Sequence, residues 1–305
     1  MSLSIYNIKK WSKMLFGDSI LHVKQGIGKS YEKGKIAGYY NDLTEKVTKS
    51  ELNEDELPIS SNEKCNAYEF PIAIFQYGLG AYDLYLQTND KGYLKRVIKA
   101  GDWAVDNQLE DGGWRCFFHR GERNTYSSMG QGEGISLLAR CYIKTKEEKY
   151  LRAMKKALNC MISPMDDGGT AYSDKEEAIL YEAVGRPVVL NGWIFSVFGL
   201  YDYLILFPND RKAKKFFDKT IKSLCDRLEQ FDLGYWSKYD DGEMVASPFY
   251  HRLHISLLNA LYDLTGKKVL NEYADRFNEY SNSKYNAARA FTKKAFQKIT
   301  ERKND

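Results

Sequence analysis

The stretch GLGAYDLYLQTNDKGYLKRVIKAGDWAVDNQLEDGGW (78–114) joins an apolar helix pattern, a polar turn at Thr88, an amphipathic helix pattern and Asp-Gly-Gly. The same order returns in GISLLARCYIKTKEEKYLRAMKKALNCMISPMDDGGT (134–170), where Thr145 takes the place of Thr88. Repeats of this length are typical of helical hairpins that stack side by side. Two looser copies follow, at 196–236 and 258–280.

Each copy begins with a helix that is apolar nearly all round and continues with one that alternates apolar and charged positions. The first pattern is typical of a buried inner helix and the second of an outer helix. The sequence therefore predicts an all-α fold, a partial α/α toroid of about four helical hairpins over 67–300. Residues 1–66 are expected to add an N-terminal helix, a small β-hairpin or loop (19–43) and a charged excursion (44–66) to the same structural unit. Residues 298–305 are expected to form a polar tail.

Composition excludes several classes of protein. The 305 residues include 45 basic and 41 acidic ones, spread evenly, so no basic stripe marks a nucleic-acid surface. No stretch has the length and apolarity of a membrane span, and no secretory leader is evident. Five cysteines without a CxxC pair indicate ordinary reduced thiols rather than disulfides or a zinc site. We therefore expect a soluble cytoplasmic protein, with a homodimer left open.

Tyrosine is unusually frequent, with 23 tyrosines against four histidines. A tyrosine ring packs on sugar C–H groups while its hydroxyl forms a hydrogen bond, so the excess favours carbohydrate binding. Core packing explains most individual tyrosines equally well.

The segments that lead into the four inner helices carry the candidate functional residues. They are NAYEFPIAIFQYG (66–78), NTYSSMGQGEG (124–134), YEAVGRPVVLNGW (181–193) and SPFYHRLHI (247–255). All four should lie on one rim of the toroid, and each supplies a tyrosine: Tyr68, Tyr126, Tyr181 and Tyr250. Converging helix N-termini present unpaired N–H groups and partial positive charge, which favours an anionic ligand.

Several polar and aromatic residues near this rim are predicted to bind substrate. They are Tyr68, Gln76, Tyr77, Tyr126, Gln131, Arg186, Asn191, Trp236, His251, Arg252 and His254. Asn191, in the apolar run VVLNGWIF, either caps a neighbouring turn or faces a cavity. His251 and His254 have no carboxylate at the spacing of a metallohydrolase motif, so no metal is expected.

Two further segments have more than one interpretation. The glycines of MGQGEG (129–134) follow no predicted strand and precede no Lys-Ser/Thr, so close helix packing is favoured over a phosphate loop. The segment 232–243 is predicted to be a loop. Its aromatic residues Tyr235, Trp236 and Tyr239 are expected to be exposed unless they line a cleft.

At these same residues the sequence resembles the C-terminal domain of the D-glucuronyl C5-epimerases, which convert glucuronate to iduronate in heparan-type polysaccharides such as heparosan. The resemblance covers roughly 68–280 and rests on six ordered motifs. They are PIAIFQYGLGAY, DNQLEDGGW, YSSMGQGEGIS, VLNGWIFSVFGLYD, FDLGYWSKYD and FYHRLHI. The chain lacks the β-rich insertion and the membrane anchor of animal members, so we expect a minimal, bacterial version.

The resemblance implies catalytic tyrosines and a glutamate that flank C5 of the uronate, and an asparagine that holds the sugar. By motif, the tyrosines are Tyr250, Tyr239 and Tyr181, and the asparagine is Asn191. Where the family reads Glu-Tyr-Pro, this chain has Leu-Tyr-Glu at 180–182. Either Glu182 supplies the glutamate from a shifted backbone position, or the glutamate is absent.

The reaction that the resemblance implies removes the proton alpha to a carboxylate and returns one to the opposite face. We expect Tyr250 to serve one face, Tyr181 with Glu182 the other, and Tyr239 to assist, with no cofactor. The partner would be an anionic, glucuronate-containing polysaccharide. A polysaccharide lyase, a glycoside hydrolase using carboxylates among Glu133, Glu182 and Asp240, and a non-catalytic glycan-binding module are the alternatives.

Overall fold

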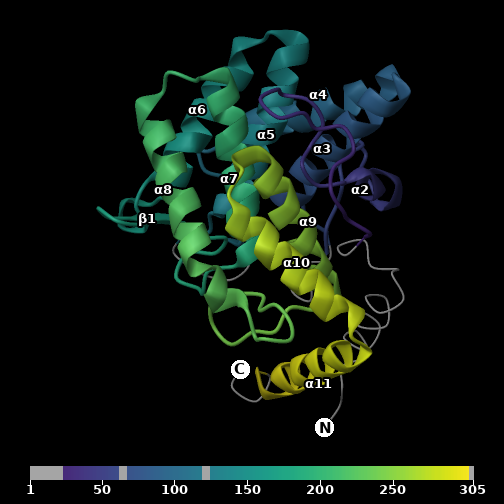
Figure 1. Ribbon diagram of the computed structural model, residues 1–305. Coiled ribbons are helices and arrows are strands. Elements are labelled where there is room, and N and C mark those ends of the chain that lie inside the picture. Colours follow the sequence, from purple (N-terminus) through teal and green to yellow (C-terminus); the bar gives the residue numbers. More distant parts are fainter. Residues whose placement is uncertain (1–22, 62–66, 119–123, 302–305) are drawn as a thin grey trace.

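The computed structural model describes residues 23–61, 67–118 and 124–301, and shows four helical hairpins side by side (Figure 1). The predicted N-terminal helix falls largely outside these residues. The inner helices are α3 (Pro71–Thr88), α5 (Ser128–Thr145), α7 (Leu190–Leu206) and α9 (Pro248–Thr265). The outer helices are α4 (Lys91–Asp106), α6 (Glu148–Ile162), α8 (Arg211–Arg227) and α10 (Lys268–Asn282). Shorter or peripheral elements are α2 (Thr44–Lys49), η3 (Met165–Asp167), β1 (Ala171–Ser173), β2 (Ala178–Leu180), η4 (Leu228–Phe231) and α11 (Lys284–Glu301).

The inner helices are buried on nearly all sides, whereas each outer helix buries only one stripe. Each inner helix packs on the outer helix that follows it, and the inner helices neighbour one another in the order α3, α5, α7, α9. The single sheet within the described residues is the short antiparallel pair β1 and β2. These contacts confirm the prediction of an all-α, partial α/α toroid with four hairpins.

A repeated threonine ends three of the four inner helices. In each case the hydroxyl donates to the carbonyl four residues earlier and accepts from the N–H two residues later; the residues are Thr88, Thr145 and Thr265. The next residue adopts the left-handed conformation that ends a helix, at Asn89, Lys146 and Gly266. The turn that repeats in the sequence is therefore the same hydrogen-bonded structure each time.

Glycines let α5 and α7 approach closely in parallel. A Cβ at Gly132 would lie 2.6 Å from the Cα of Ser196, and one at Gly199 would lie 2.2 Å from the carbonyl oxygen of Gly132. Near the helix starts, Ser196 Oγ donates to Ser128 Oγ at 2.8 Å. The MGQGEG segment is thus a helix-packing motif, as predicted.

Residues 26–41 form a loop, here called the plug, across the C-terminal ends of the inner helices. The buried Arg140 of α5 pairs with Asp202 of α7 at 2.7 Å and donates to the carbonyl of Gly38 in the plug at 2.8 Å. Tyr40 Oη donates to the second oxygen of Asp202 at 2.5 Å. The plug is therefore held on the helices by hydrogen bonds from Gly38 and Tyr40 to a buried ion pair.

Three expectations need adjustment. The described part of 19–43 is irregular chain with one isolated bridge between Ile27 and Asn41, so the loop alternative holds there rather than the β-hairpin. The charged segment 44–66 contains α2, which packs on α3 because its own residues Lys46 and Val47 are buried. The expected polar tail overlaps α11, which runs to Glu301.

No helix in the described part of the chain combines the length and apolarity needed to cross a bilayer. Four of the five cysteines lie there, and all four are free thiols: Cys116, Cys141, Cys160 and Cys225.

The plug contact gives a stability prediction. Arg140→Met leaves Asp202 buried without its partner, and the free energy of unfolding should fall by about 3–5 kcal/mol in urea denaturation. The control is Lys222→Met, which breaks the exposed Lys222–Asp226 pair of α8 and should leave stability unchanged within error. Equal effects of the two substitutions would contradict the structural role given to Arg140.

Candidate active site

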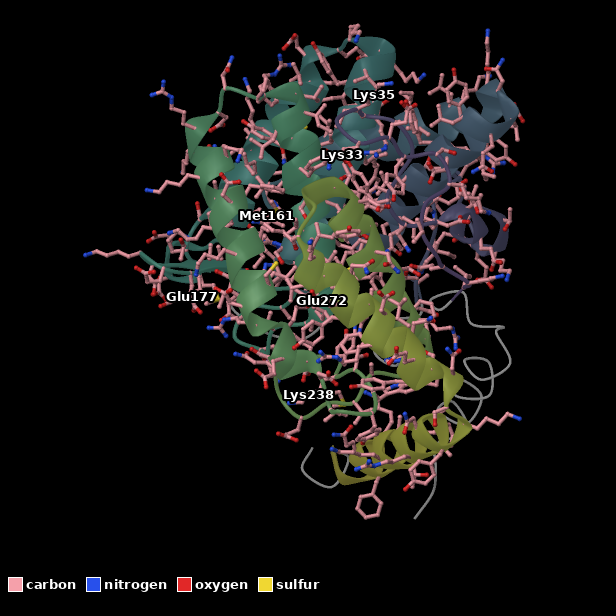
Figure 2. All side chains as sticks on the ribbon, viewed as in Figure 1. Lys33, Lys35, Met161, Glu177, Lys238 and Glu272 are labelled. Atoms are coloured by element: carbon pink, nitrogen blue, oxygen red, sulfur yellow. The ribbon has the colours of Figure 1, made fainter. Side chains whose placement is uncertain are left out.

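The N-terminal ends of the inner helices lie on one rim, opposite the plug. In Figure 2 Lys33 of the plug and Lys238 of the chain before α9 lie at opposite ends of the helices. Backbone hydrogen bonds hold the rim segments together: the N–H of Ser128 donates to the carbonyl of Tyr181 at 3.0 Å, and the N–H of Leu190 to that of Tyr239 at 3.2 Å. The starts of α5 and α7 are thus each bonded to the segment that leads into the next inner helix.

Glu182 lies at the centre of this rim, just after β2. Its carboxyl group packs directly on the start of α7, because a Cβ at Gly192 would lie only 2.4 Å from Glu182 Oε2. The glycine of the LNG motif therefore makes room for this carboxyl. Glu182 Oε2 is buried, and its charge acts on the neighbouring Glu133, Cys116 and Tyr250.

Tyr250 and Tyr239 meet beside Glu182. Their ring centroids are 4.8 Å apart in an edge-to-face arrangement, and a hydrogen bond joins the two side chains. Burial and the negative charge of Glu182 raise the pKa of Tyr250 far above the usual value for tyrosine, although the bond with Tyr239 lowers it in part. Tyr250 is therefore protonated at neutral pH and can donate a proton.

Glu133 is a second carboxyl group, fully buried on the inner face of α5. Gln76 Nε2 of α3 donates to Glu133 Oε1 at 3.0 Å, while Glu133 Oε2 has no hydrogen-bond partner among the described residues. Burial raises the pKa of Glu133 to about 8, opposed by the bond from Gln76 and the charge of Lys46 and reinforced by Glu182. At neutral pH this carboxyl is mostly protonated, so only one of the two neighbouring glutamates need carry charge.

Two of these groups were not predicted as part of a site. Lys46 of α2 is buried near Glu133, and burial lowers its pKa to about 8. Cys116 is also buried, and burial together with the charges of Glu133 and Glu182 raises the pKa of its thiol. Their sequence neighbourhoods carry no motif, and a lysine within a charged segment gives no sign of burial.

Asn191, one residue into α7, is 3% exposed, and its Oδ1 has no partner within the described ranges. Its Oδ1 therefore caps no neighbouring turn in these ranges, and the alternative that Asn191 faces a cavity and binds substrate stays a prediction. Tyr77 is buried, with its hydroxyl directed toward Arg96 of the outer helix α4. Glu182, Tyr239 and Tyr250 are here called the rim cluster. Asn191 and Gln76 lie near it, whereas the Tyr77 hydroxyl is directed away from it.

The two histidines and Trp236 form a buried support for the rim loop, defined here as residues 232–247. The rings of Trp236 and His251 stack with centroids 3.7 Å apart. His251 Nε2 donates to the carbonyl of Phe277 at 2.9 Å, and its Nδ1 accepts from the N–H of Ser237 at 3.1 Å. His254 Nδ1 lies 3.0 Å from Ser237 Oγ. Trp236 and Tyr235 are buried and Tyr239 is half-buried, so the expectation of exposure fails for the first two.

Three other predicted residues bond to the protein itself. The side-chain amide of Gln131 donates to two backbone carbonyls and accepts from the N–H of Trp114, which occupies its donors. Tyr126 Oη donates to Asp111 at 2.6 Å. Tyr68 packs edge-to-face against Phe118. Gln131 therefore has no donor left for a sugar.

Tyr181 has charged neighbours other than Glu182. Its pKa is raised by burial and by Asp241 of the rim loop, and lowered in part by Arg227 of α8. Arg227 pairs with Glu177 at 2.7 Å. Glu177 lies on the turn between β1 and β2 (Figure 2). Arg186 and Arg252 are exposed. The structure thus brings together Tyr250, Tyr239 and Glu182, but not the pair of Tyr181 and Glu182.

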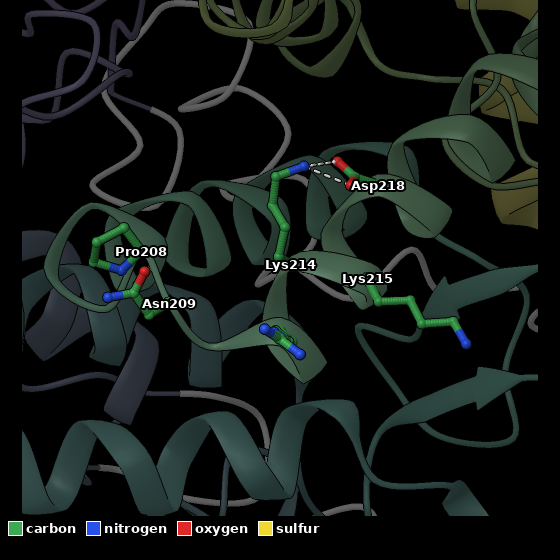
Figure 3. A pocket seen from close by; sticks show the side chains of 6 residues that line it. Pro208, Asn209, Lys214, Lys215 and Asp218 are labelled. Carbon is green, nitrogen blue, oxygen red and sulfur yellow. Dashed lines mark hydrogen bonds and ion pairs between the residues drawn. The ribbon is translucent and has the colours of Figure 1, made fainter.

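A surface hollow of about 630 Å³ lies at the turn between α7 and α8, lined by Pro208, Asn209, Arg211, Lys214, Lys215 and Asp218 (Figure 3). Lys214 pairs with Asp218 across it. The hollow follows the C-terminal end of α7 and is therefore on the opposite end of the molecule from the rim. It contributes nothing to the rim cluster.

Residues 106–279, which include most of the rim, match the family described as D-glucuronyl C5-epimerase C-terminus. The chain belongs to this family. It is 31% identical over 213 residues to a D-glucuronyl C5-epimerase of Caenorhabditis elegans, covering 61% of this chain and 35% of that one. It is 27% identical over 158 residues to an uncharacterized protein of Methanocaldococcus jannaschii, covering 50% and 51%. The chain therefore spans about a third to a half of the length of these relatives.

Solved structures with a similar helical arrangement include a sugar epimerase from a ruminal bacterium, with a TM-score of 0.49 and 15% identity over 69% of this chain and 59% of that one. A polysaccharide lyase gives a TM-score of 0.48 and 12% identity over 76% and 65%. These values are too low to bear on the reaction.

The buried Glu133 should make stability depend on pH. Its raised pKa means that the folded chain keeps a proton between pH 4.5 and about 8 that the unfolded chain releases. The contribution of Glu133 to stability should therefore fall as pH rises through this window, at up to about 1.4 kcal/mol per pH unit. Below about pH 6.5 the buried His251 and His254 contribute with the opposite sign, because the unfolded chain binds protons that they exclude in the folded chain. In urea denaturation at several pH values, the stability of Glu133→Gln relative to wild type should therefore rise across the window, whereas that of the exposed Glu148→Gln should stay constant. An unchanged slope in Glu133→Gln would contradict the assignment.

The bonds of His251 fix its tautomer and charge. The pKa of His251 is lowered to about 4 and that of His254 to about 3, chiefly by burial. Both rings should remain neutral at about pH 5, where an exposed histidine is charged. Nitrogen-15 NMR should show His251 with its proton on Nε2. Protonation of either ring near pH 6.5 would show that the support opens in solution.

Proposed function

We propose that this protein epimerises D-glucuronyl residues of an anionic polysaccharide at C5, giving L-iduronyl residues. The observation that carries the proposal is the rim cluster in which a buried carboxyl, Glu182, lies beside a protonated tyrosine, Tyr250, in a chain that belongs to the epimerase family. Epimerisation requires one group that accepts a proton and one that donates one. In this cluster Glu182 is the proposed acceptor and Tyr250 the proposed donor.

In the proposed reaction Glu182 removes the C5 proton and the electron pair of the C–H bond moves toward the substrate carboxylate. Tyr250 then donates its proton to C5 from the opposite face. The hydrogen bond from Tyr239 stabilises the tyrosinate that this donation leaves. The proton on Glu182 must return to Tyr250 before the next turnover. Tyr181 positions Glu182 through the backbone, since its N–H and carbonyl are bonded to Thr170 and Ser128.

The charge arrangement supports this chemistry. A substrate carboxylate next to two ionised glutamates would be repelled, but burial keeps Glu133 mostly protonated at neutral pH. The start of α7 contributes positive partial charge, because its N-cap residue Val189 offers no side-chain cap. Asn191 lies in this first turn and would hold a sugar hydroxyl or the carboxylate.

Two carboxyls at the rim also favour one other candidate, a glycoside hydrolase. That reaction needs Glu133 and Glu182 on opposite sides of a glycosidic bond. Glu133 is fully buried and bonded to Gln76, which places it behind the rim rather than across from Glu182. The geometry therefore favours proton transfer at carbon.

The test is hydrogen exchange at C5. The protein, incubated with heparosan in deuterated water, should incorporate deuterium at C5 and produce iduronate, both measured by NMR. An unsaturated product absorbing in the ultraviolet would identify a lyase, new reducing ends a hydrolase, and binding without exchange a glycan-binding module. Each of these three outcomes would overturn the proposal.

Tyr250→Phe removes the proton donor and should lower the exchange rate by about 10²–10⁴-fold while polysaccharide affinity is retained. The matched control is Tyr262→Phe, three turns further along α9, which should exchange at the wild-type rate. Unchanged exchange in Tyr250→Phe would assign the donor role elsewhere.

A further inference from the structure

Helix α11 lies at the edge of the molecule, beyond the rim loop and apart from the inner helices (Figure 1). One face packs on the rim loop: Ala290 is buried, and Gln297 Oε1 accepts from the N–H of Val245 at 3.0 Å. The guanidinium of Arg289 lies 3.7 Å from the ring centroid of Tyr235, and Lys294 Nζ lies 5.7 Å from that of Tyr239. α11 is therefore attached to the loop that carries Tyr239.

The opposite face of α11 exposes large apolar side chains. Tyr285 is 75% exposed and Phe296 69%, whereas no large apolar side chain elsewhere in the described residues exceeds 43%. Phe291 adds a third aromatic ring at 41%. Tyr285, Ala288, Thr292 and Phe296 follow one another at three- and four-residue spacing, so they form one continuous stripe along the helix.

Basic residues border this stripe. Residues 284–297 include four basic side chains and no acidic one: Lys284, Arg289, Lys293 and Lys294. By helical periodicity Lys284 falls at one edge of the apolar stripe and Arg289 and Lys293 at the other, whereas Lys294 lies on the opposite face, toward Tyr239. An apolar face with aromatic rings, bordered by lysine and arginine, is the pattern of helices that lie in the interface of an anionic bilayer.

Other occupants fit less well. A second copy docked through the same face would bring the two sets of like charges together. A polysaccharide that extends from the rim would meet the opposite side of α11, since the stripe points away from Tyr239. We propose that α11 docks this protein on an anionic lipid surface, with its aromatic residues among the headgroups and its basic residues at the phosphates. Docking in this way holds the rim loop next to the bilayer.

The test uses the full chain and vesicles of phosphatidylcholine with or without phosphatidylglycerol. The protein should co-sediment with the anionic vesicles, much less with the neutral ones, and less as salt is raised. The double variant Phe291→Ser and Phe296→Ser should lower the bound-to-free ratio by about tenfold or more. Lys284→Glu should also weaken binding.

Two matched variants serve as controls. Tyr172→Ser removes an exposed ring of β1, and Lys215→Glu reverses an exposed charge of α8; both should bind like wild type. Equal circular dichroism would show that all variants fold. Absence of binding to anionic vesicles, or binding unchanged in the double variant, would overturn the proposal. So would a changed oligomeric state in the double variant without lipid, or loss of heparosan affinity with no vesicle binding. None of these outcomes depends on C5 exchange.

Discussion

The close parallel packing of α5 against α7 determines where the functional side chains lie. Gly132 and Gly199 bring the two backbones into contact, and any Cβ there would separate them. Because the helices are parallel, their starts share one rim and their ends share the other. The Arg140–Asp202 pair holds the far ends beneath the plug, and the bond from Ser128 to Tyr181 holds the near ends. The packing therefore separates the plug end of the molecule from the rim that carries the proposed site.

At the rim, burial determines which side chains keep a proton. Two glutamates lie near each other with one buried lysine, and three full charges in this position would be costly. Glu133 keeps its proton because it is fully enclosed, although the bond from Gln76 opposes this, whereas Glu182 reaches the rim beside Tyr250. The same burial raises the pKa of Tyr250. Burial is thus the main reason why both the Glu133 carboxyl and the Tyr250 phenol have raised pKa values.

The rim loop connects this chemistry to the rest of the chain. Trp236 and His251 stack beneath it and fix its path, so that Tyr239 meets Tyr250 from above the start of α9. α11 covers the outer side of the same loop through Gln297 and Arg289. Whatever contacts α11 therefore acts on the loop that carries Tyr239, without passing through the helical core.

Some of this was predictable. The Thr turns, the apolar inner helices and the four rim segments follow from local patterns with fixed periods, because hydrogen bonds in turns and helices depend on neighbours a few residues away. His251 and Trp236 were expected near a ligand, but the structure uses both to support the rim loop. Sequence alone cannot tell a polar residue that binds substrate from one that bonds to a distant backbone group. Gln131 shows the same limit, since the groups it bonds are far from it in the chain.

The sequence by itself determined the class of fold, the number of hairpins and the common rim, and it singled out Tyr250 as a candidate. Only the tertiary structure decided that Glu182 and Tyr239 share the rim with Tyr250, that Tyr181 has Asp241 and Arg227 as charged neighbours, and that Lys46 and Glu133 are buried together. The reason is that burial and charge coupling arise from residues far apart in the chain. Their positions depend on how closely the helices pack.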